Sequence, residues 1–316
     1  MIGMNLKEIK KPVEKLIDST NNILSSTVMS DVSLINDIKK LVPFTKGKKI
    51  RSMLLFLLSG MNNNLSEDLP VVASSVELFH LSSLIHDDIL DNAKLRRGEK
   101  TLNDNFGNLI SVLGGDFLFV HSLNLMNSLT DRELMNILLL STKIMVEGQI
   151  QEIENNFNHD ISFETYNEII EKKTSSLFAA VSEMAAAING FDKDKREQFY
   201  RFGINFGNIF QISDDLLDIF SNTSGKEQFK DLIEGKTTLP YILLRDKCDC
   251  DVKKYFSSEH REKLLELFEE YNIKELSLKK VDEYYAECLE FLETFPDSAY
   301  KDSLQKLLAF IRYRDY

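Results

Sequence analysis

Residues 69–93 read LPVVASSVELFHLSSLIHDDILDNA, and this stretch decides the fold. Its residues recur at three- and four-residue spacing on one stripe, as in an amphipathic α-helix: Val72, Val76, Phe79, Ser83 and Asp87. No proline occurs between Pro70 and Pro240, and the chain shows neither strict alternation nor a repeat of fixed period. The sequence therefore predicts an all-α protein.

The same periodicity continues along the chain and predicts a succession of helices. They span residues 4–28, 49–60, 69–93, 105–128, 131–156, 162–190, 193–222, 238–247, 260–271, 275–293 and 298–313. Glycine and charge concentrate in the expected loops near residues 41–48, 94–104 and 223–237. A length of 316 residues exceeds the usual single-domain size, but no low-complexity linker divides the chain. We therefore expect one all-α domain over residues 1–316.

The composition argues against several classes of protein. A formal net charge of −12 leaves no basic excess to neutralise phosphates, which argues against nucleic acid as a partner. The three cysteines, Cys248, Cys250 and Cys288, lack the paired spacing of a zinc site, so we expect free thiols. The first residues carry Glu8 and several lysines where a signal peptide needs an apolar stretch. No uninterrupted apolar run reaches the ~18 residues of a membrane span, so we expect a soluble, cytoplasmic protein.

Two aspartate triplets carry most of the chemical signal, one late in the helix of residues 69–93 and one in the helix of residues 193–222. Their members are Asp87, Asp88, Asp91, Asp214, Asp215 and Asp218. The first and last aspartate of each triplet share a helix face, where like charges repel and apolar neighbours add a desolvation cost. A solvated acidic face is the simple alternative for either copy, but both copies have apolar neighbours. Clustered carboxylates on facing helices suit Mg²⁺, whose coordination is commonly completed by water and substrate phosphate oxygens.

Basic side chains cluster near both triplets, as an anionic phosphate ligand requires. The basic segments are residues 46–51 (KGKKIR), 96–97 (RR), 172–174 (KKT), Lys226 and 235–238 (GKTT). Any one of them could be an exposed basic turn, but their joint occurrence favours a phosphate site. His80 lies two helical turns before Asp87 and could reach a diphosphate oxygen, or it could be a satisfied core histidine. His86 is expected to pack or to support its neighbours.

Successive blocks of the sequence resemble, in order, the signature blocks of the trans-polyprenyl diphosphate synthase family. They are GKKIR (47–51), FHLSSLIHDDILDNAKLRRG (79–98), NFGN (105–108) followed by LGGDFLF (113–119), EKKTSSLF (171–178), FGNIFQISDDLLDIF (206–220) and KDLIEGKTTLP (230–240). The likeness spans roughly residues 44–242. It implies an isoprenoid-synthase helical bundle around a central cavity, and repeated condensation of isopentenyl diphosphate with an allylic diphosphate. It also implies Mg²⁺ as cofactor, about three ions per site, a homodimer, and transient membrane contact during product release.

The resemblance implies a role for each matching position. Isopentenyl diphosphate would be bound by Lys48, Arg51, His80 and Arg97. The allylic diphosphate would be bound by Arg96, Lys173, Thr174, Gln211, Lys226 and Lys236, of which Lys173 and Lys236 also count as catalytic. The leading metal ligands would be Asp87, Asp91 and Asp214, with Asp88, Asp215 and Asp218 as further or supporting ligands. Two departures from the family pattern, Lys46 for a usual glycine and Ser52 for a usual proline, affect the loop geometry beside these residues.

Product length depends on the wall below the first triplet. The growing chain is expected to pass Val76, Phe79, Ser82 and Ser83. In the family that this chain resembles, a bulky aromatic residue immediately below the first triplet acts as a floor that keeps products short. Here Ser82 and Ser83 are small, so that floor is absent. This implies a medium-to-long polyprenyl product, with a geranylgeranyl or farnesyl product as the alternative. Phe79 is about 12 Å deeper by helical rise and is either a lower floor or a core phenylalanine.

Two other functions compete with this interpretation. A class I terpene cyclase also ionises allylic diphosphates in an α-helical bundle, but such enzymes typically carry an Asn/Ser/Glu metal triad in place of the second aspartate triplet. A regulatory subunit without activity of its own would be marked by loss of triplet aspartates, and here all six are present.

Overall fold

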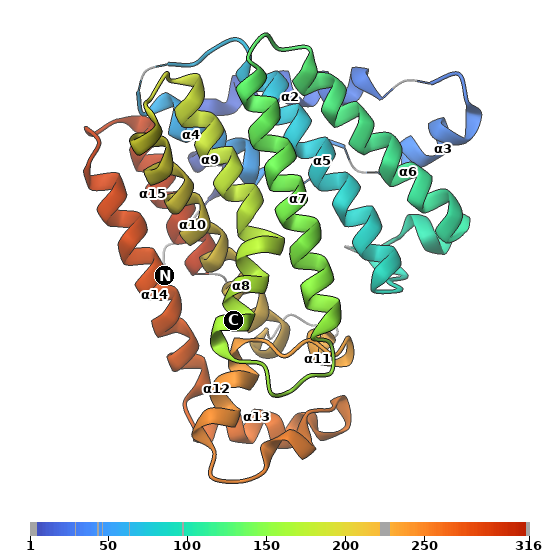
Figure 1. Ribbon diagram of the computed structural model, residues 1–316, viewed down its shortest axis with the longest axis vertical. Helices are drawn as coiled ribbons and strands as arrows, with labels where there is room; N and C mark the ends of the chain where they lie inside the picture. Colours follow the sequence, from blue (N-terminus) through green and yellow to red (C-terminus); the bar gives the residue numbers. More distant parts are fainter. Residues whose placement is uncertain are drawn as a thin grey trace. The chain divides into compact units, whose positions relative to one another are not determined.

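The computed structural model describes residues 5–28, 30–42, 44–45, 47–62, 64–96, 98–221 and 228–313 (Figure 1). Helices dominate this described part, which also contains one pair of two-residue strands, so the predicted all-α fold is confirmed. The contacts between Cα atoms divide the chain into two compact units. We call Asn5–Leu138 with Met184–Phe191 the N-terminal unit, and Leu139–Glu183 with Asp192–Tyr316 the C-terminal unit. The expectation of one domain over residues 1–316 stays a prediction.

The N-terminal unit is a layer of helices with a small hairpin. Its elements are α1 (Leu6–Lys10), η1 (Lys11–Val13), α2 (Glu14–Thr27), α3 (Ser33–Leu41), α4 (Ile50–Gly60), α5 (Leu69–Leu90), β1 (Leu95–Arg96), β2 (Glu99–Lys100) and α6 (Leu102–Asn127). The strands pair antiparallel, with Leu95 opposite Lys100 and Arg96 opposite Glu99. The helices α7 (Arg132–Glu154) and α9 (Ser176–Ile188) each run from one unit into the other.

The helices α5 and α6 form the main helix pair of the N-terminal unit (Figure 1). They approach closely because Gly115 of α6 has no side chain: a Cβ there would lie 2.3 Å from Nε2 of His86. The Ser82 hydroxyl donates to the Gly115 carbonyl at 2.8 Å, and the ring of Phe79 lies 5.9 Å from that of Phe119. The pair therefore fixes which face of α5 turns towards α6.

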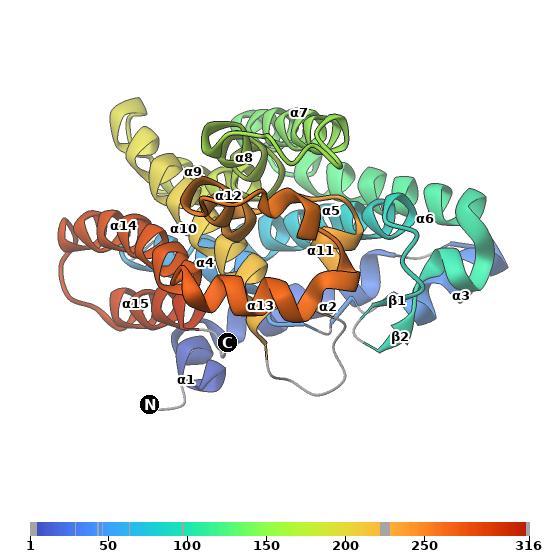
Figure 2. The same ribbon diagram turned by 90° about the horizontal axis from the view of Figure 1, so that it is seen from below.

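The C-terminal unit carries the rest of the chain. Its elements, after most of α7, are α8 (Phe163–Ile170), η2 (Glu171–Ser175, a π-helix), the start of α9, α10 (Lys193–Phe220), α11 (Lys230–Ile233), α12 (Leu239–Lys247), η3 (Val252–Tyr255), η4 (Ser258–His260), α13 (Arg261–Glu270), α14 (Ile273–Glu293) and α15 (Ala299–Arg312). In Figures 1 and 2, α14 and α15 run side by side, and both pack against α10.

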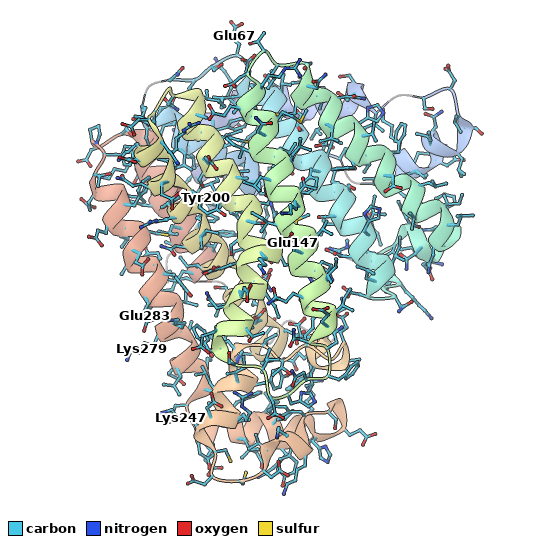
Figure 3. The ribbon with its side chains drawn as sticks, viewed as in Figure 1. Glu67, Glu147, Tyr200, Lys247, Lys279 and Glu283 are labelled. Atoms are coloured by element: carbon cyan, nitrogen blue, oxygen red, sulfur yellow. The ribbon has the colours of Figure 1, made fainter. Side chains whose placement is uncertain are left out.

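The helix α14 shows how sequence periodicity orients these elements. Val281 and Cys288 on one face are fully buried, whereas Lys279 and Glu283 project to solvent (Figure 3). Cys248, Cys250 and Cys288 are free thiols, as expected.

The predicted helices match the structure with boundary differences of a few residues, and two short helices were not predicted. The helix α3 is only nine residues long and has no side-chain N-cap. The four-residue α11 starts on the carboxylate of Asp218 in α10, a tertiary contact that local sequence does not reveal. The helix predicted over residues 162–190 forms, but the π-helix η2 interrupts it.

By length and composition alone, α5 and α6 could each cross a membrane, which the sequence analysis did not anticipate. The apolar windows have mean hydropathies of 1.2 and 1.5. The window in α5 is 67% buried, as in a core helix of a soluble protein, whereas that in α6 is only 33% buried. The apolar surface of α6 therefore needs a separate explanation.

Candidate active site

A pocket of about 100 Å³ lies in the C-terminal unit. Its charged and polar lining includes Glu152, Tyr166, Lys173, Thr174, Gln211, Asp215, Asp231 and Lys236, which come from α7, α8, η2, α10 and the segment around α11. Of the residues predicted to bind the allylic diphosphate, the structure thus brings together Lys173, Thr174, Gln211 and Lys236. The pocket combines ammonium groups with buried carboxylates.

A chain of hydrogen bonds crosses this pocket and ends on Asp215. The Thr174 hydroxyl donates to Oε1 of Gln211 at 2.8 Å, and Nε2 of Gln211 donates to Oδ1 of Asp215 at 2.8 Å. The Tyr166 hydroxyl donates to Oδ2 of Asp215 at 2.5 Å. Burial, followed by the charge of Asp231, raises the pKa of Asp215 to about 8. Both oxygens of this carboxylate are held in one orientation.

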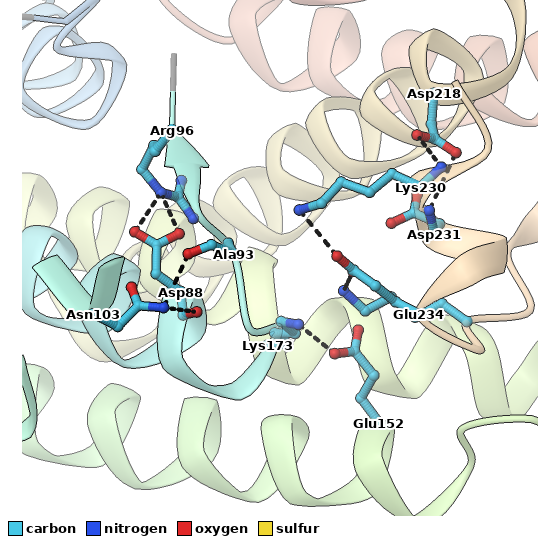
Figure 4. Close-up of polar contacts among 11 residues, drawn as sticks. Asp88, Ala93, Arg96, Asn103, Glu152, Lys173, Asp218, Lys230, Asp231 and Glu234 are labelled. Atoms are coloured by element: carbon cyan, nitrogen blue, oxygen red, sulfur yellow. Dashed lines mark hydrogen bonds and ion pairs between the residues drawn. The ribbon is translucent and has the colours of Figure 1, made fainter. Parts of the chain in front are cut away.

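The last aspartate of the second triplet, Asp218, anchors α11 (Figure 4). Its carboxylate accepts the backbone N–H of Lys230 at 3.0 Å and that of Asp231 at 3.3 Å. These are unsatisfied donors of a helix N-terminus, where a negative charge is favourable. Burial and then the charge of Asp231 raise the pKa of Asp218 to about 7. Asp218 thereby ties α11 and the following KTT segment to α10.

The pocket lysines are each paired with a glutamate (Figure 4). Nζ of Lys173 is bound to Oε2 of Glu152. Nζ of Lys236 lies 2.6 Å from Oε2 of Glu234, whose other oxygen lies 3.0 Å from Nζ of Lys230. Burial alone would raise the pKa of Glu234, but Lys236 and Lys230 outweigh it and lower that pKa. The ammonium groups are therefore held in place by acidic side chains.

The first triplet lies at the end of α5 in the N-terminal unit. The buried Asp88 carboxylate accepts two hydrogen bonds from Nε of Arg96, at 2.8 and 3.0 Å (Figure 4). Asn103 of α6 donates to the carbonyl of Asp88 at 3.3 Å. Asp87 and Asp91 are half-buried, one turn apart, and the Asp91 N–H donates to the Asp87 carbonyl at 2.8 Å. Two residues predicted for separate roles, Asp88 and Arg96, are thus paired with each other.

Three of the residues predicted to bind isopentenyl diphosphate lie in or just before α4 and in α5. Nη1 of Arg51 lies 3.1 Å from Nε2 of His80, and Lys48 is exposed just before α4. Burial lowers the pKa of Arg51 to about 10, partly opposed by the charge of Glu77, so the guanidinium stays cationic at neutral pH. His80 therefore faces a cation.

The residues predicted to line the product chain do not share one face of α5. Val76, Phe79 and Ser83 lie in the row of Asp87, and the Ser83 hydroxyl donates to the carbonyl of His80 at 2.8 Å. Phe79 and Ser82 are buried and turn towards α6, as their contacts with Phe119 and Gly115 show. Of these four residues, Ser82 is the one that lies off the row that leads to Asp87, about 100° around the helix from Ser83.

Some predicted residues cannot be placed, and some functional groups were missed. Arg97, Lys226 and the variant position Lys46 lie outside the described residues. Sequence reasoning missed Glu152, Tyr166 and Asp231 as members of the pocket. Asp231 stands inside the KDLIEGK block and could have been found there, whereas the partnership of Tyr166 with Asp215 exists only in the folded chain.

The carboxylates fit a metal that binds together with substrate. Among the residues that the structure describes, no three His, Cys, Asp or Glu side chains are grouped closely enough to hold a metal ion alone. The triplets nevertheless offer only oxygen donors, the type that Mg²⁺ prefers, and protein Mg²⁺ sites are commonly completed by phosphate and water. The carboxylate oxygens of the triplets therefore suit Mg²⁺ that arrives with a diphosphate better than they suit a metal ion held by the protein alone.

Comparisons with known proteins agree along the chain. A family model described as "Polyprenyl synthetase" matches residues 33–281. The octaprenyl diphosphate synthase of Haemophilus influenzae is 28% identical, over 99% of this chain and 98% of that protein. The heptaprenyl diphosphate synthase component 2 of Bacillus subtilis is 30% identical, over 95% of this chain and 88% of that protein. The crystal structure of a polyprenyl synthase from Caulobacter crescentus, complexed with calcium and isoprenyl diphosphate, has 27% identity and a TM-score of 0.92, and the match covers 99% of this chain and 98% of that one.

Proposed function

This chain belongs to the polyprenyl synthetase family, and from that premise we propose that it is a magnesium-dependent prenyltransferase. It joins isopentenyl diphosphate head-to-tail to an allylic diphosphate, releases diphosphate and repeats the step. The observation that carries this proposal is the pocket of the C-terminal unit, where Lys173, Lys236 and the bonded pair Thr174 and Gln211 meet buried carboxylates.

The allylic diphosphate binds to the lysines of this pocket. Lys173 and Lys236 are held by Glu152 and Glu234. A diphosphate presents the same kind of oxygen acceptor with more negative charge, so it can replace the glutamates as partner of the ammonium groups. Thr174 adds a hydroxyl donor on the same wall. The pocket thus supplies cations and donors for the group that leaves.

The carboxylate triplets hold the metal that the diphosphate brings. When bound, Mg²⁺ would supply positive charge against the leaving diphosphate, a large contribution to lowering the ionisation barrier. Asp87, Asp91 and Asp214 would be the direct ligands, and Asp88, Asp215 and Asp218 would orient the segments around them through the hydrogen bonds that they make in the protein. The calcium in the Caulobacter structure supports a divalent cation in this family.

Isopentenyl diphosphate is held by Lys48, Arg51, His80 and Arg97. As the allylic carbon–oxygen bond breaks, the double bond of isopentenyl diphosphate attacks the resulting cation and forms the new carbon–carbon bond. A proton is then lost to the released diphosphate, so no protein nucleophile is needed. Apolar surroundings exclude water that would quench the cation.

The product is a medium-to-long all-trans polyprenyl diphosphate. Two similar proteins are named octaprenyl and heptaprenyl diphosphate synthases, and the positions immediately below the first triplet carry the small Ser82 and Ser83 instead of a bulky aromatic. A geranylgeranyl or farnesyl product is the alternative, and product analysis separates the two.

The decisive experiment incubates the full-length protein with Mg²⁺, farnesyl diphosphate and labelled isopentenyl diphosphate, followed by dephosphorylation and chromatographic sizing. We expect a ladder that ends in one dominant linear prenol longer than geranylgeraniol, and no incorporation once the metal is chelated. A cyclic hydrocarbon would point to a terpene cyclase. No incorporation at all would point to a subunit that needs a partner.

We also propose that the enzyme is a homodimer of cytoplasmic chains that meets the membrane only as product leaves. The helix α6 exposes an apolar stripe: Leu109, Val112, Leu113 and Val120. Such a face is normally covered by another surface. A polyprenyl tail gains about 0.8 kcal/mol per buried methylene, so it enters a bilayer far more readily than water. Finding the protein in the washed membrane fraction of lysed cells would contradict the cytoplasmic location.

A further inference from the structure

The N-terminal unit contains a buried carboxylate that the proposed function does not use. Glu77 of α5 is only 6% exposed. Its Oε1 accepts the hydroxyl of Ser52 at 2.7 Å and, more weakly, the backbone N–H of Ser52 at 3.4 Å. Its Oε2 lies 3.3 Å from Nζ of Lys49. One carboxylate therefore contacts the residue that precedes α4 and the third residue of α4.

The first turn of α4 explains why the contact with Glu77 is needed. Lys49, the N-cap residue, is left-handed at φ 55°, and its side chain makes no capping hydrogen bond. It is also buried, and its ammonium group donates to the carbonyl of Phe44 at 2.7 Å. A buried ammonium ion, a strained backbone and an uncapped helix N-terminus are each unfavourable alone. Glu77 offsets the first and the last of these, because it supplies countercharge to the ammonium group and a cap to the helix start from the neighbouring helix.

This contact lies directly beside the side chains proposed to bind isopentenyl diphosphate. Arg51 stands between Lys49 and Ser52 in the first turn of α4, and His80 follows Glu77 by one turn of α5. The contact between Nη1 of Arg51 and Nε2 of His80, at 3.1 Å, therefore joins the same two turns that Glu77 ties together. Any rotation of the first turn of α4 would separate the pair.

Residue 52, a serine where the family usually has proline, contributes directly to the contact between α4 and α5. Proline, the residue that the family usually has there, offers neither a hydroxyl nor an N–H. Ser52 offers both, and both point to Glu77. Ser52 therefore adds a hydrogen bond between α4 and α5 that proline could not make.

We propose that Glu77 is a positioning residue for isopentenyl diphosphate, acting through Lys49 and Ser52 to hold Arg51 against His80. The inference rests on the proposed function. Glu77 does not touch the substrate, so its loss should weaken the binding of isopentenyl diphosphate while leaving the binding of the allylic substrate unaffected.

The test is a calorimetric titration of the full chain with isopentenyl diphosphate alone, combined with KM values for both substrates. We expect Glu77→Gln to weaken binding about tenfold, and Ser52→Ala about threefold, with the same rise in KM for isopentenyl diphosphate. The KM for the allylic diphosphate should change less than about twofold. Ser74→Ala is the matched control: it removes a buried hydroxyl of α5 that bonds to Pro70 and not to α4, and it should bind as the wild type does.

The possible failures can be told apart. If the wild-type protein neither binds nor incorporates isopentenyl diphosphate, the proposed function is wrong. If the wild type binds it and Glu77→Gln binds equally well, or if both KM values rise together, the positioning role is overturned. Should Glu77→Gln fail to fold by circular dichroism, Ser52→Ala decides instead, and unchanged affinity in that variant overturns the role.

Discussion

At the scale of the residue, the two roles open to Phe79, a floor for the product chain or a core phenylalanine, make different predictions. Its ring is buried at 3% exposure and packs on Phe119 of α6. We expect Phe79→Ala to lengthen the dominant product by at least one isoprene unit, because the removed ring opens space beside Phe119. Chromatography of the dephosphorylated products measures their chain length. An unchanged chain length would reject Phe79 as a floor.

The control for this variant is the loss of a similar ring elsewhere in the same unit. Truncation of a buried phenylalanine costs about 3–5 kcal/mol of folding stability wherever it lies. Phe56 of α4 is fully buried, so Phe56→Ala carries a comparable cost. It should leave product length unchanged, which separates an effect on the chain path from general loosening of the fold.

At the scale of the element, the π-helix η2 places Lys173 and Thr174 on the wall of the pocket. Two glycines confine it: a Cβ at Gly148 of α7 would lie 2.5 Å from the backbone nitrogen of Lys173, and one at Gly207 of α10 would lie 2.4 Å from Cα of Ser175. We expect Gly207→Ala to shift η2 and raise the KM for the allylic diphosphate about tenfold, with little change in the KM for isopentenyl diphosphate.

Steady-state kinetics with each substrate varied in turn measure this effect. Gly114→Ala is the matched control, because a Cβ at Gly114 would meet only the side chains of Ile38 and Leu102, at ordinary contact distances of 3.5 Å and above. Equal KM changes for both substrates in Gly207→Ala would show that η2 has no specific role at the allylic site.

At the scale of the whole molecule, the apolar stripe of α6 predicts the oligomeric state. Leu113 lies in the middle of the stripe and is 58% exposed. Charge placed there would be buried unpaired in a dimer interface, so Leu113→Glu should produce monomers. Light scattering after size-exclusion chromatography reads out the mass. Val32→Glu, at a similarly exposed apolar residue outside the stripe, should stay dimeric. A dimeric Leu113→Glu protein would mean that the stripe is not the interface.

The buried carboxylates predict how the stability of the metal-free protein changes with pH. Burial raises the pKa of Asp215 to about 8 and that of Asp218 to about 7, from a usual value of 3.8. An acid whose pKa is higher in the folded than in the unfolded state stabilises the fold at low pH and loses that contribution as pH rises. We therefore expect Tm to fall by roughly 5 °C between pH 6 and pH 8.5.

Scanning calorimetry across this pH range checks the expectation. The double variant Asp215→Asn with Asp218→Asn has no titratable group at these positions, so its Tm should vary less with pH than that of the wild type. A wild-type Tm that is flat or rises across the range would show that these carboxylates are already ionised in the folded protein.

The all-α fold and the residue types of the candidate site could be predicted from local sequence. Periodicity and the scarcity of proline are local properties, so they reveal helices such as α5 and α10 directly. The aspartate triplets and the KKT and GKT segments were visible for the same reason. The short helices α3, of nine residues, and α11, of four residues, were not visible, because they offer few turns over which a period can be recognised.

The pairing of side chains from different helices became visible only in the folded structure. Asp215 is held by Tyr166 from 49 positions away, and Glu77 meets Ser52 from 25 positions away. Asp88 is paired with Arg96, and Lys173 with Glu152, although the sequence assigned Asp88, Arg96 and Lys173 to a ligand and gave no role to Glu152. Such pairings depend on helix packing, because a buried charge is stable only beside a partner that the fold brings close to it. The spacing of residues along one helix does not show which residues of another helix lie next to it.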